Sequence, residues 1–299
     1  MISIIIPFHN EEQNLPILFH KLKDEINKLK IEYEIIFVDD GSTDLGKAQL
    51  EKTIEKDSKS KILVLRKNYG KGKALETGFF ESKGEIIVFM DADLQDDPQD
   101  IPKFIHKINE GYDLVNGYRK KRNDGVDKTF PSKIYNKLIA RLFNVDLHDI
   151  NCGFKVMRRE VLENVRLYGD NYRILPILAK NEGFKITEVE VDHHARQYGV
   201  SKYGFWRMLF GFFDLISYFF LIKYVEKPLH FFGTVGVSIF ALGSLILIYL
   251  GIERIYFQEL LYRRPILFLG LLLVIVGVQI IVTGFIGELI VYLNKRQSR

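Results

Sequence analysis

The sequence predicts an α/β fold with a mostly parallel sheet, followed by interfacial helices and a two-helix transmembrane hairpin. Two observations support this prediction. Short runs rich in Ile, Val and Phe alternate with helical stretches early in the chain, and the last third holds two long apolar segments. The 299 residues are 47% hydrophobic and 27% charged, which excludes a disordered or fibrous chain.

The first part of the chain reads as a strand–helix series. Strands are expected at residues 2–6, 34–38, 61–65 and 85–90, and helices near residues 11–29, 44–57, 72–82 and 98–109. Such a series forms a parallel sheet that helices cover on both faces. Ligands of these sheets bind beyond the carboxyl ends of the strands.

The region after residue 110 is less regular. Residues 113–117 and 153–157 are expected to be strands, and residues 132–144 a helix. Apolar and polar residues alternate in 185–192, which is typical of an antiparallel edge strand.

Two segments are long enough to cross a membrane. Residues 231–252 carry no charge over 22 positions, and residues 266–286 have only Gln279 and Thr283 as clearly polar interruptions. At about 1.5 Å per residue each spans the roughly 30 Å hydrocarbon layer. The alternative is a pair of buried helices in a soluble protein, but helices this uniformly apolar rarely fit a domain of this size.

The distribution of charged residues favours binding to a membrane surface, with the first 202 residues on the cytosolic side. The formal charge of +4 lies entirely in residues 203–299, which hold nine Lys or Arg against five Asp or Glu. No long basic stripe suited to nucleic acid is present in the sequence. Five basic residues flank the hairpin and three lie in its loop, and no signal peptide precedes the first strand, so residues 1–202 are expected in the cytosol.

An aromatic stretch precedes the hairpin. Residues 203–224 hold many Phe and Tyr residues and Trp206 among few charges, which favours helices in the headgroup region of a bilayer. A helix packed on the soluble domain is the alternative. We therefore expect an α/β domain at residues 1–202, interfacial helices at 203–227 and the hairpin with a short tail at 228–299.

The pair Asp91 and Asp93 is the best candidate for a metal site. Residues two apart in an extended segment project to the same side, and with Gln95 they offer hard oxygen ligands that suit Mg²⁺ or Mn²⁺ better than zinc. A solvated acidic turn is the alternative, because more Asp residues follow. Phosphate usually completes a metal shell of two or three side chains, so the pattern favours a nucleotide ligand.

The end of the second strand offers further polar groups. Asp39 and Asp40 could accept hydrogen bonds from ribose hydroxyls or a base, whereas Ser42, Thr43 and Asp44 are expected mainly to cap the next helix.

Residues 70–73, Gly-Lys-Gly-Lys, do not fit the Walker pattern, and no G-x-G-x-x-G follows a strand. Lys73 could still meet phosphate at a helix start. A solvated lysine cluster is an equal alternative.

Five short motifs, in a fixed order along the chain, make the functional interpretation more specific. They are Ser-Ile-Ile-Ile-Pro-Phe-His-Asn-Glu-Glu at 3–12, Asp-Asp-Gly-Ser-Thr-Asp at 39–44, Asp-Ala-Asp-Leu-Gln at 91–95, Asn-Cys-Gly-Phe at 151–154 and Arg-Gln-Tyr-Gly-Val-Ser-Lys-Tyr at 196–203. This set resembles the family 2 glycosyltransferases of the Rossmann-like GT-A fold. More narrowly, it resembles the polyprenyl-phosphate glycosyltransferases, the group of dolichol-phosphate mannose synthase and bacterial undecaprenyl-phosphate glucosyl- and aminoarabinosyltransferases.

The resemblance implies a role for each matching residue. The nucleotide pocket would be lined by Pro7, Phe8, Asn10, Glu11, Val38, Asp39 and Asp40, with Phe8 where the family usually has Tyr. The metal and the donor diphosphate would be held by Asp91, Asp93 and Gln95, with Ala92 between the two acids. The lipid phosphate would meet Arg119, Lys133, Arg196, Ser201 and Lys202.

The resemblance also implies a catalytic role for Asp149, because it matches the acid proposed as a base in bacterial relatives. A phosphate monoester has a second pKa near 6 and is already ionised at neutral pH, so strong base catalysis is hardly needed. Asp149 would instead orient the acceptor or the sugar hydroxyls, or stabilise an oxocarbenium-like transition state. The alternative is a turn residue before Gly153. His193 and His194 are expected to be ordinary edge-strand residues, and Cys152 a packed one.

The expected function is inverting transfer of a hexose from a nucleotide sugar, UDP-glucose first, to polyprenyl phosphate at the cytosolic membrane face, with Mg²⁺ or Mn²⁺. A GDP-mannose-dependent synthase or an amino-sugar transferase is the first alternative. A processive polysaccharide synthase is disfavoured, because the single tryptophan, Trp206, lies outside a Gln-x-x-Arg-Trp motif. A nonenzymatic membrane scaffold is the alternative from another class. A homo-oligomer is possible, since Gly233, Gly236 and Gly243 would let helices approach, between copies or within the hairpin.

Overall fold

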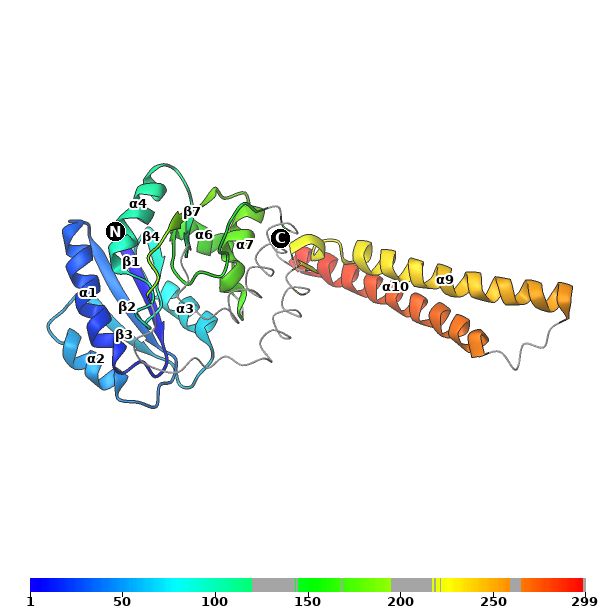
Figure 1. Cartoon of the computed structure of the whole chain (residues 1–299), viewed down its shortest axis with the longest axis horizontal. Coiled ribbons are helices and arrows are strands. Elements are labelled where there is room, and N and C mark those ends of the chain that lie inside the picture. The colour runs from blue at the N-terminus through cyan, green and yellow to red at the C-terminus, as the bar shows by residue number, and fades with distance from the viewer. Residues whose placement is uncertain are drawn as a thin grey trace. The chain divides into compact units, whose positions relative to one another are not determined.

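The computed structural model describes residues 1–119, 145–167, 169–194, 222–258 and 265–297, together with positions 143, 217, 219 and 220. The chain divides into two compact units, Met1–Phe205 and Trp206–Arg299. The first holds the α/β fold and the second holds two long helices (Figure 1).

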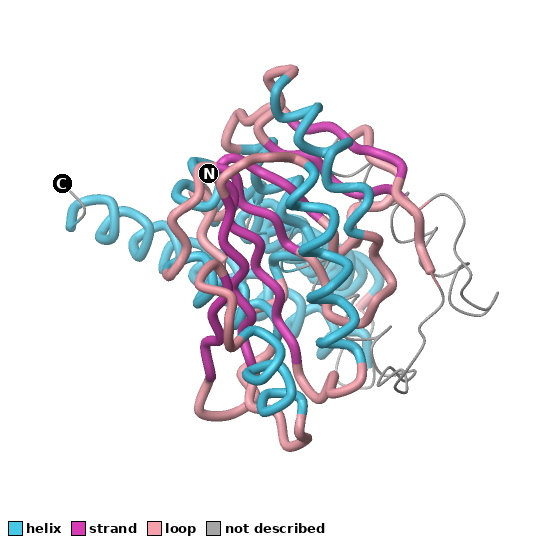
Figure 2. Tube along the Cα trace, turned by 90° about the vertical axis from the view of Figure 1, so that its left-hand side faces the viewer, coloured by secondary structure: helices cyan, strands magenta, loops and turns pink. Residues whose placement is uncertain are grey.

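One mixed sheet of seven strands organises the described part of the first unit (Figure 2). The spatial order is β3-β2-β1-β4-β6-β5-β7. Strands β1 to β4 run parallel, β6 is antiparallel to both of its neighbours, and β7 is parallel to β5. All strands except β6 therefore present their carboxyl ends at one edge. The bounds are β1 (Ile2–Phe8), β2 (Tyr33–Asp39), β3 (Ser60–Val64), β4 (Ile86–Phe89), β5 (Leu114–Tyr118), β6 (Lys155–Arg158) and β7 (Ile186–Glu190).

Helices cover both faces, as the alternating pattern predicts. Along β2, Phe37 packs in one hydrophobic cluster while Ile36 and Val38 pack in the other, because successive side chains point to opposite faces. The first cluster includes residues of α1 (Asn14–Lys28), α2 (Gly46–Ile54) and α4 (Ile101–Asn109), which follows the short 3₁₀ helix η1 (Pro98–Asp100). The second includes residues of α3 (Lys71–Phe80), α6 (Arg159–Asn164) and α7 (Leu175–Asn181), the last preceded by η2 (Asn171–Ile174).

The first two helices begin later than the sequence predicts. Glu12 and Asp44 lie outside the helices because they join the two loops to each other. The backbone N–H of Glu12 donates to Asp44 Oδ2 at 3.0 Å, and Gln49 donates to Glu12 Oε1 at 2.6 Å. The residues that seemed to begin each helix instead fix the strand ends.

The direction predicted for the last strand was wrong. Residues 185–192 were expected to form an antiparallel edge, but β7 lies at the edge and runs parallel to β5. Alternation of apolar and polar residues reports burial on one face only, and it carries no information on direction. The helices α6 and α7 provide the crossover after β6 that returns the chain parallel to β5. The predicted helix at 132–144 lies outside the described residues apart from position 143.

The second unit contains a helical hairpin. Its helices are α9 (Pro228–Phe257) and α10 (Pro265–Gln297), with mean hydropathy of 2.3 and 2.9 in their most apolar windows. Only 17% and 11% of those windows is buried, so these are not core helices of a soluble domain. Each is long and apolar enough to cross a bilayer, and we treat the chain as a membrane protein.

Glycines allow the two helices of the hairpin to pack closely. A Cβ added at Gly236 would lie 2.8 Å from the Gly277 carbonyl oxygen, and one at Gly243 would lie 2.9 Å from the Gly270 carbonyl oxygen. These contacts give Gly236 and Gly243 a role within the hairpin. At one end of the hairpin, Glu288 of α10 accepts a hydrogen bond of 3.3 Å from the backbone N–H of Leu229, in the first turn of α9.

Candidate active site

Candidate residues from distant parts of the chain meet at the carboxyl edge of the sheet. Loops follow β1, β2, β4 and β5 there, and the segment 149–154 enters the same edge because β6 runs antiparallel. The site is built from these five segments, and the start of α3 and residues 193 and 194 after β7 border it.

The loops after β1 and β2 are bonded to each other. Asn10 has a left-handed backbone with φ of 58°. Its N–H donates to Ser42 Oγ at 3.0 Å, and its side-chain oxygen accepts from the Thr43 N–H at 2.8 Å. The expected capping role of Ser42 and Thr43 is therefore wrong, since α2 begins after Leu45. Asp44 does accept from the first N–H of α2, that of Gly46, at 3.1 Å.

Asp39 and Asp40 are almost fully buried and hold backbone turns. Asp39 Oδ1 accepts from the Ser42 N–H at 2.8 Å, and Asp40 accepts from the N–H groups of Tyr69 at 2.7 Å and Gly70 at 2.9 Å. Asp40 thus ties the end of β2 to the start of α3. These bonds show how the two carboxylates shape the edge, whereas their predicted contacts to ribose or base remain a prediction.

The other predicted nucleotide residues differ in how far a ligand can reach them. Phe8 is 3% exposed and Val38 fully buried, and Pro7 is buried as well. Asn10 is exposed and Glu11 half-buried, with Glu11 accepting a hydrogen bond from Asn14 at 2.5 Å. The buried three can form the floor of a pocket, and the polar two can contact a ligand directly.

The acidic segment that follows β4 begins with Asp91, which forms an ion pair. Asp91 Oδ1 pairs with the ammonium of Lys71, the first residue of α3. Burial is the largest single influence and would raise the pKa of Asp91, but the charge and hydrogen bond of Lys71 together with the charges of Arg119 and Lys155 outweigh burial and lower that pKa. Ala92, the next residue, is buried.

Asp93 is 8% exposed and accepts from the Gln95 N–H at 3.2 Å. Leu94 between them has a φ of 61°, a left-handed conformation that is costly for a branched side chain and occurs mostly where a site demands it.

The donor chemistry of this segment fits a divalent cation. Asp96 is 5% exposed, and its pKa is raised to about 7 by burial and then by the carboxylates of Asp91 and Asp93. A cation among these acids would relieve that repulsion. No group of three His, Cys, Asp or Glu side chains in the described residues forms a metal cage. Oxygen atoms of a bound phosphate can complete the shell of an ion that two or three side-chain oxygens hold.

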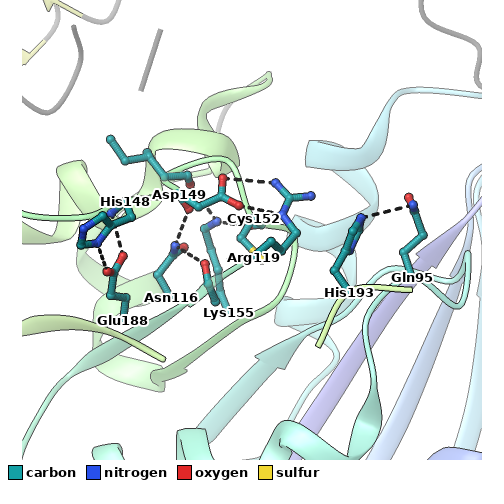
Figure 3. A network of polar contacts seen from close by, with 11 residues as sticks. Gln95, Asn116, Arg119, His148, Asp149, Cys152, Lys155, Glu188 and His193 are labelled. Carbon is teal, nitrogen blue, oxygen red and sulfur yellow. Dashed lines mark hydrogen bonds and ion pairs between the residues drawn. The ribbon is translucent and has the colours of Figure 1, made fainter. Parts of the chain in front are cut away.

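Two histidines lie against the acidic segment, a contact that the sequence did not predict. Asp96 and His193 form an antiparallel bridge, and the His194 N–H donates to the Gln95 carbonyl oxygen at 2.9 Å. Gln95 Nε2 and His193 Nε2 are 3.4 Å apart (Figure 3). His194 Nε2 lies 3.1 Å from Asp97 Oδ2. The 98 residues that separate Gln95 and His193 hid this contact from sequence reasoning.

Arg119 and Asp149 form a bidentate ion pair in the centre of the site. Arg119 Nε donates to Asp149 Oδ2 at 2.7 Å and Arg119 Nη2 donates to Asp149 Oδ1 at 3.2 Å (Figure 3). The two side chains are 17% and 2% exposed. Asn116 of β5 donates to the Asp149 carbonyl oxygen at 2.7 Å. The sequence predicted both charged residues at the site without predicting that they bind each other.

A buried lysine and a cysteine lie beneath this pair. Lys155 is 2% exposed and donates to the carbonyl oxygens of Ile150 and Cys152, and burial lowers the pKa of Lys155 to about 8. Burial likewise raises the pKa of Cys152 to about 12, so the thiol stays protonated. Lys155 could not be recognised as a buried residue from the sequence, because a lysine at the start of a strand is usually solvated.

Lys73 lies in a different environment from Lys71. It pairs with Glu76 at 2.6 Å and borders a cavity of about 340 Å³ between the start of α3 and residues 166–170. Four predicted residues for the lipid phosphate lie outside the described residues, namely Lys133, Arg196, Ser201 and Lys202.

Comparison with known proteins gives a consistent result. Residues 3–166 match the family described as Glycosyl transferase family 2. The chain is 36% identical over 294 residues to a dodecaprenyl-phosphate galacturonate synthase from Rhizobium johnstonii, covering 97% of this chain and 87% of that one. It is 33% identical over 291 residues to an undecaprenyl-phosphate 4-deoxy-4-formamido-L-arabinose transferase from Shewanella sediminis, covering 97% and 86%.

Solved structures share the fold at lower identity. Glucosyl-3-phosphoglycerate synthase from Mycobacterium tuberculosis, in complex with Mn²⁺ and UDP-glucose, superposes with a TM-score of 0.59 at 19% identity, covering 74% of this chain and 78% of that one. The same enzyme with Mn²⁺, UDP and phosphoglyceric acid gives 0.55 at 21% identity, covering 67% and 72%.

Proposed function

Because the chain belongs to glycosyl transferase family 2, we propose that it transfers a sugar from a nucleotide-sugar donor to a polyprenyl phosphate at a membrane surface. The observation that carries this proposal is the meeting of the Asp91–Asp93 acids with the Arg119–Asp149 pair at one sheet edge, in a chain that also holds an apolar hairpin. The relatives named above act on dodecaprenyl and undecaprenyl phosphate, so the expectation of an enzyme stands and that of a nonenzymatic scaffold does not.

We propose Asp91, Asp93 and Gln95 as the residues that hold a divalent cation together with the donor diphosphate. The bound ion would neutralise the charge that develops on the leaving diphosphate. The structural neighbour that binds Mn²⁺ with UDP supports a divalent metal on this fold, and the choice between Mg²⁺ and Mn²⁺ is left to experiment. Asn10 and Glu11, with Asp39 and Asp40, would position the nucleotide.

Arg119 and Asp149 would act on the acceptor side. The guanidinium has five N–H groups and gives two of them to Asp149, so it can also contact a phosphate. Because Asp149 is held by Arg119 and the acceptor phosphate is already ionised, Asp149 suits orientation or charge stabilisation better than proton removal. An acceptor oxygen that attacks opposite the diphosphate would invert the anomeric configuration. Lys133, Arg196, Ser201 and Lys202 are proposed to complete the lipid-phosphate contacts.

The membrane arrangement and the donor are also proposals. A polyprenyl tail stays in the bilayer, so the hairpin at 228–299 and interfacial helices at 203–227 would keep the catalytic unit at its surface, on the cytosolic side that the basic flanks favour. UDP-glucose is the first donor proposed, with GDP-mannose or an amino sugar next. The names of the relatives suggest two further donors to test, nucleotide sugars that carry galacturonate or 4-deoxy-4-formamido-L-arabinose.

A reconstitution experiment tests this function. The full chain in detergent is incubated with Mn²⁺, undecaprenyl phosphate and each nucleotide sugar in turn, and the lipid product is identified by mass. One donor should yield undecaprenyl-phosphate sugar together with a nucleoside diphosphate, and the Asp93→Asn variant should lose most of that activity. Failure of every donor, or an Asp93→Asn variant as active as the wild type, would refute the proposal.

A further inference from the structure

The ion pair between Lys71 and Asp91 places a positive side chain on a carboxylate that we assign to the cation site. Lys71 Nζ donates to Asp91 Oδ1, and the two side chains are 27% and 34% exposed. Lys71 begins α3, whose preceding residue Gly70 is fixed by its N–H bond to Asp40 at 2.9 Å. The turn at Gly70, which Asp40 holds by this hydrogen bond, therefore positions the Lys71 ammonium beside Asp91.

The surroundings of Asp91 limit how it can respond to a second cation. Its other oxygen, Oδ2, faces Gly153, where an added Cβ would lie only 2.5 Å away. The segment at Gly153 thus closes one side of the carboxylate. Lys71, in contrast, lies on the partly exposed side and has an aromatic neighbour, with its Nζ 5.1 Å from the ring centroid of Tyr172. A cation that approaches Asp91 Oδ1 must therefore displace the Lys71 ammonium.

We propose that Lys71 and the divalent cation compete for Asp91, and that cation binding releases the Lys71 ammonium towards the donor diphosphate. The inference rests on the proposed function, because the cation and the diphosphate belong to it. Lys71 neutralises Asp91 until the cation binds, which limits the repulsion among the buried acids. Afterwards Asp91 and Asp93 face the doubly charged ion, and the freed ammonium meets the negative charge that the donor brings.

Competition predicts an effect of unusual sign. A residue that only supports the fold, or that helps to hold the cation, weakens cation binding when it is removed. Lys71 should do the opposite, because its removal takes away both a competitor and a like charge. Lys71→Met should bind Mn²⁺ roughly tenfold more tightly than the wild type, the factor expected when a charge-assisted hydrogen bond no longer has to be broken.

The experiment measures Mn²⁺ affinity of the full chain in detergent, from the paramagnetic resonance signal of free Mn²⁺ and without nucleotide. Lys67→Met is the matched control, since Lys67 is an exposed lysine of the loop that precedes α3 and lies over the ring of Tyr69 at 5.1 Å. It should bind Mn²⁺ as the wild type does. A Lys71→Met variant that binds Mn²⁺ equally or more weakly would overturn the inference.

A second measurement on the wild-type chain needs no substitution. A carbodiimide joins a carboxylate to an adjacent amine, so it should cross-link Asp91 to Lys71 without Mn²⁺, and saturating Mn²⁺ should suppress the linked peptide in a mass spectrum. Equal cross-linking under both conditions would contradict the competition. If the wild type transfers sugar while either test fails, only this inference falls. If no donor is used, the proposed function falls whatever Lys71 does.

Discussion

Gly153→Ala tests how tightly the site holds Asp91. The added Cβ would lie 2.5 Å from Asp91 Oδ2, 2.9 Å from Cγ and 3.1 Å from Oδ1. Carbon and oxygen atoms approach to about 3.3 Å at their closest favourable contact, so the carboxylate or the 149–154 segment must shift by about 0.8 Å. Misplacement of a reacting group by about 1 Å can reduce a rate about 100-fold. We expect kcat/KM for sugar transfer to fall by about 10- to 100-fold.

The assay for this variant is initial-rate sugar transfer with the donor that the reconstitution identifies, together with the Mn²⁺ affinity. The transfer rate and the Mn²⁺ affinity should both fall. The overpacked Gly153→Ala variant should also have an unfolding free energy lower by about 1–3 kcal/mol. Gly251→Ala is the control, because a Cβ there meets no atom within 4 Å, and it should keep full activity. A Gly153→Ala variant that is as active as this control would refute the close approach of Gly153 to Asp91.

Two further predictions concern ion pairs. Asp149→Asn or Arg119→Met alone should lower the unfolding free energy by about 3 kcal/mol, because each leaves a buried charge unpaired. The double variant should lose about 2 kcal/mol less than the sum of the two single losses. Thermal unfolding in detergent measures these losses, and additive losses would contradict the ion pair. Glu188 raises the pKa of His148 by a hydrogen bond and by its charge, so their pair stabilises the fold fully below the ordinary histidine pKa of about 6.5 and less as the pH rises through the raised value. His148 is 65% exposed, so Glu188→Gln should lower the melting temperature by only about 1–2 °C at pH 6 and by less at pH 9, and an equal loss at both pH values would argue against the pair.

The sequence was sufficient for the fold class because local patterns carry it. Hydrophobic runs such as those of β1 and β2 stand beside polar loop residues, and parallel strands bring those loops to one edge. The direction of β7 could not be predicted in this way, because direction depends on which crossover precedes the strand. Helix starts were missed where Glu12 and Asp44 bond across loops.

The candidate site was predictable where a motif carries it and hidden where contacts depend on distant segments. Asp91, Asp93 and Asp149 were found from their spacing and from the family resemblance. The contacts of Lys71 with Asp91 and of His193 with Gln95 join segments 20 and 98 residues apart. A sequence shows which charges exist, but only the packed sheet edge shows which charges neutralise each other.

Diffraction from crystals of the full chain grown with Mn²⁺ and a nucleoside diphosphate, recorded at a wavelength where manganese scatters anomalously, tests the central claim most directly. We predict one anomalous peak about 2.0–2.3 Å from carboxylate oxygens of Asp91 and Asp93, with a diphosphate oxygen in its shell and the Lys71 ammonium moved off Asp91. Manganese bound elsewhere, with Lys71 still paired to Asp91 while the diphosphate is in place, would contradict the account.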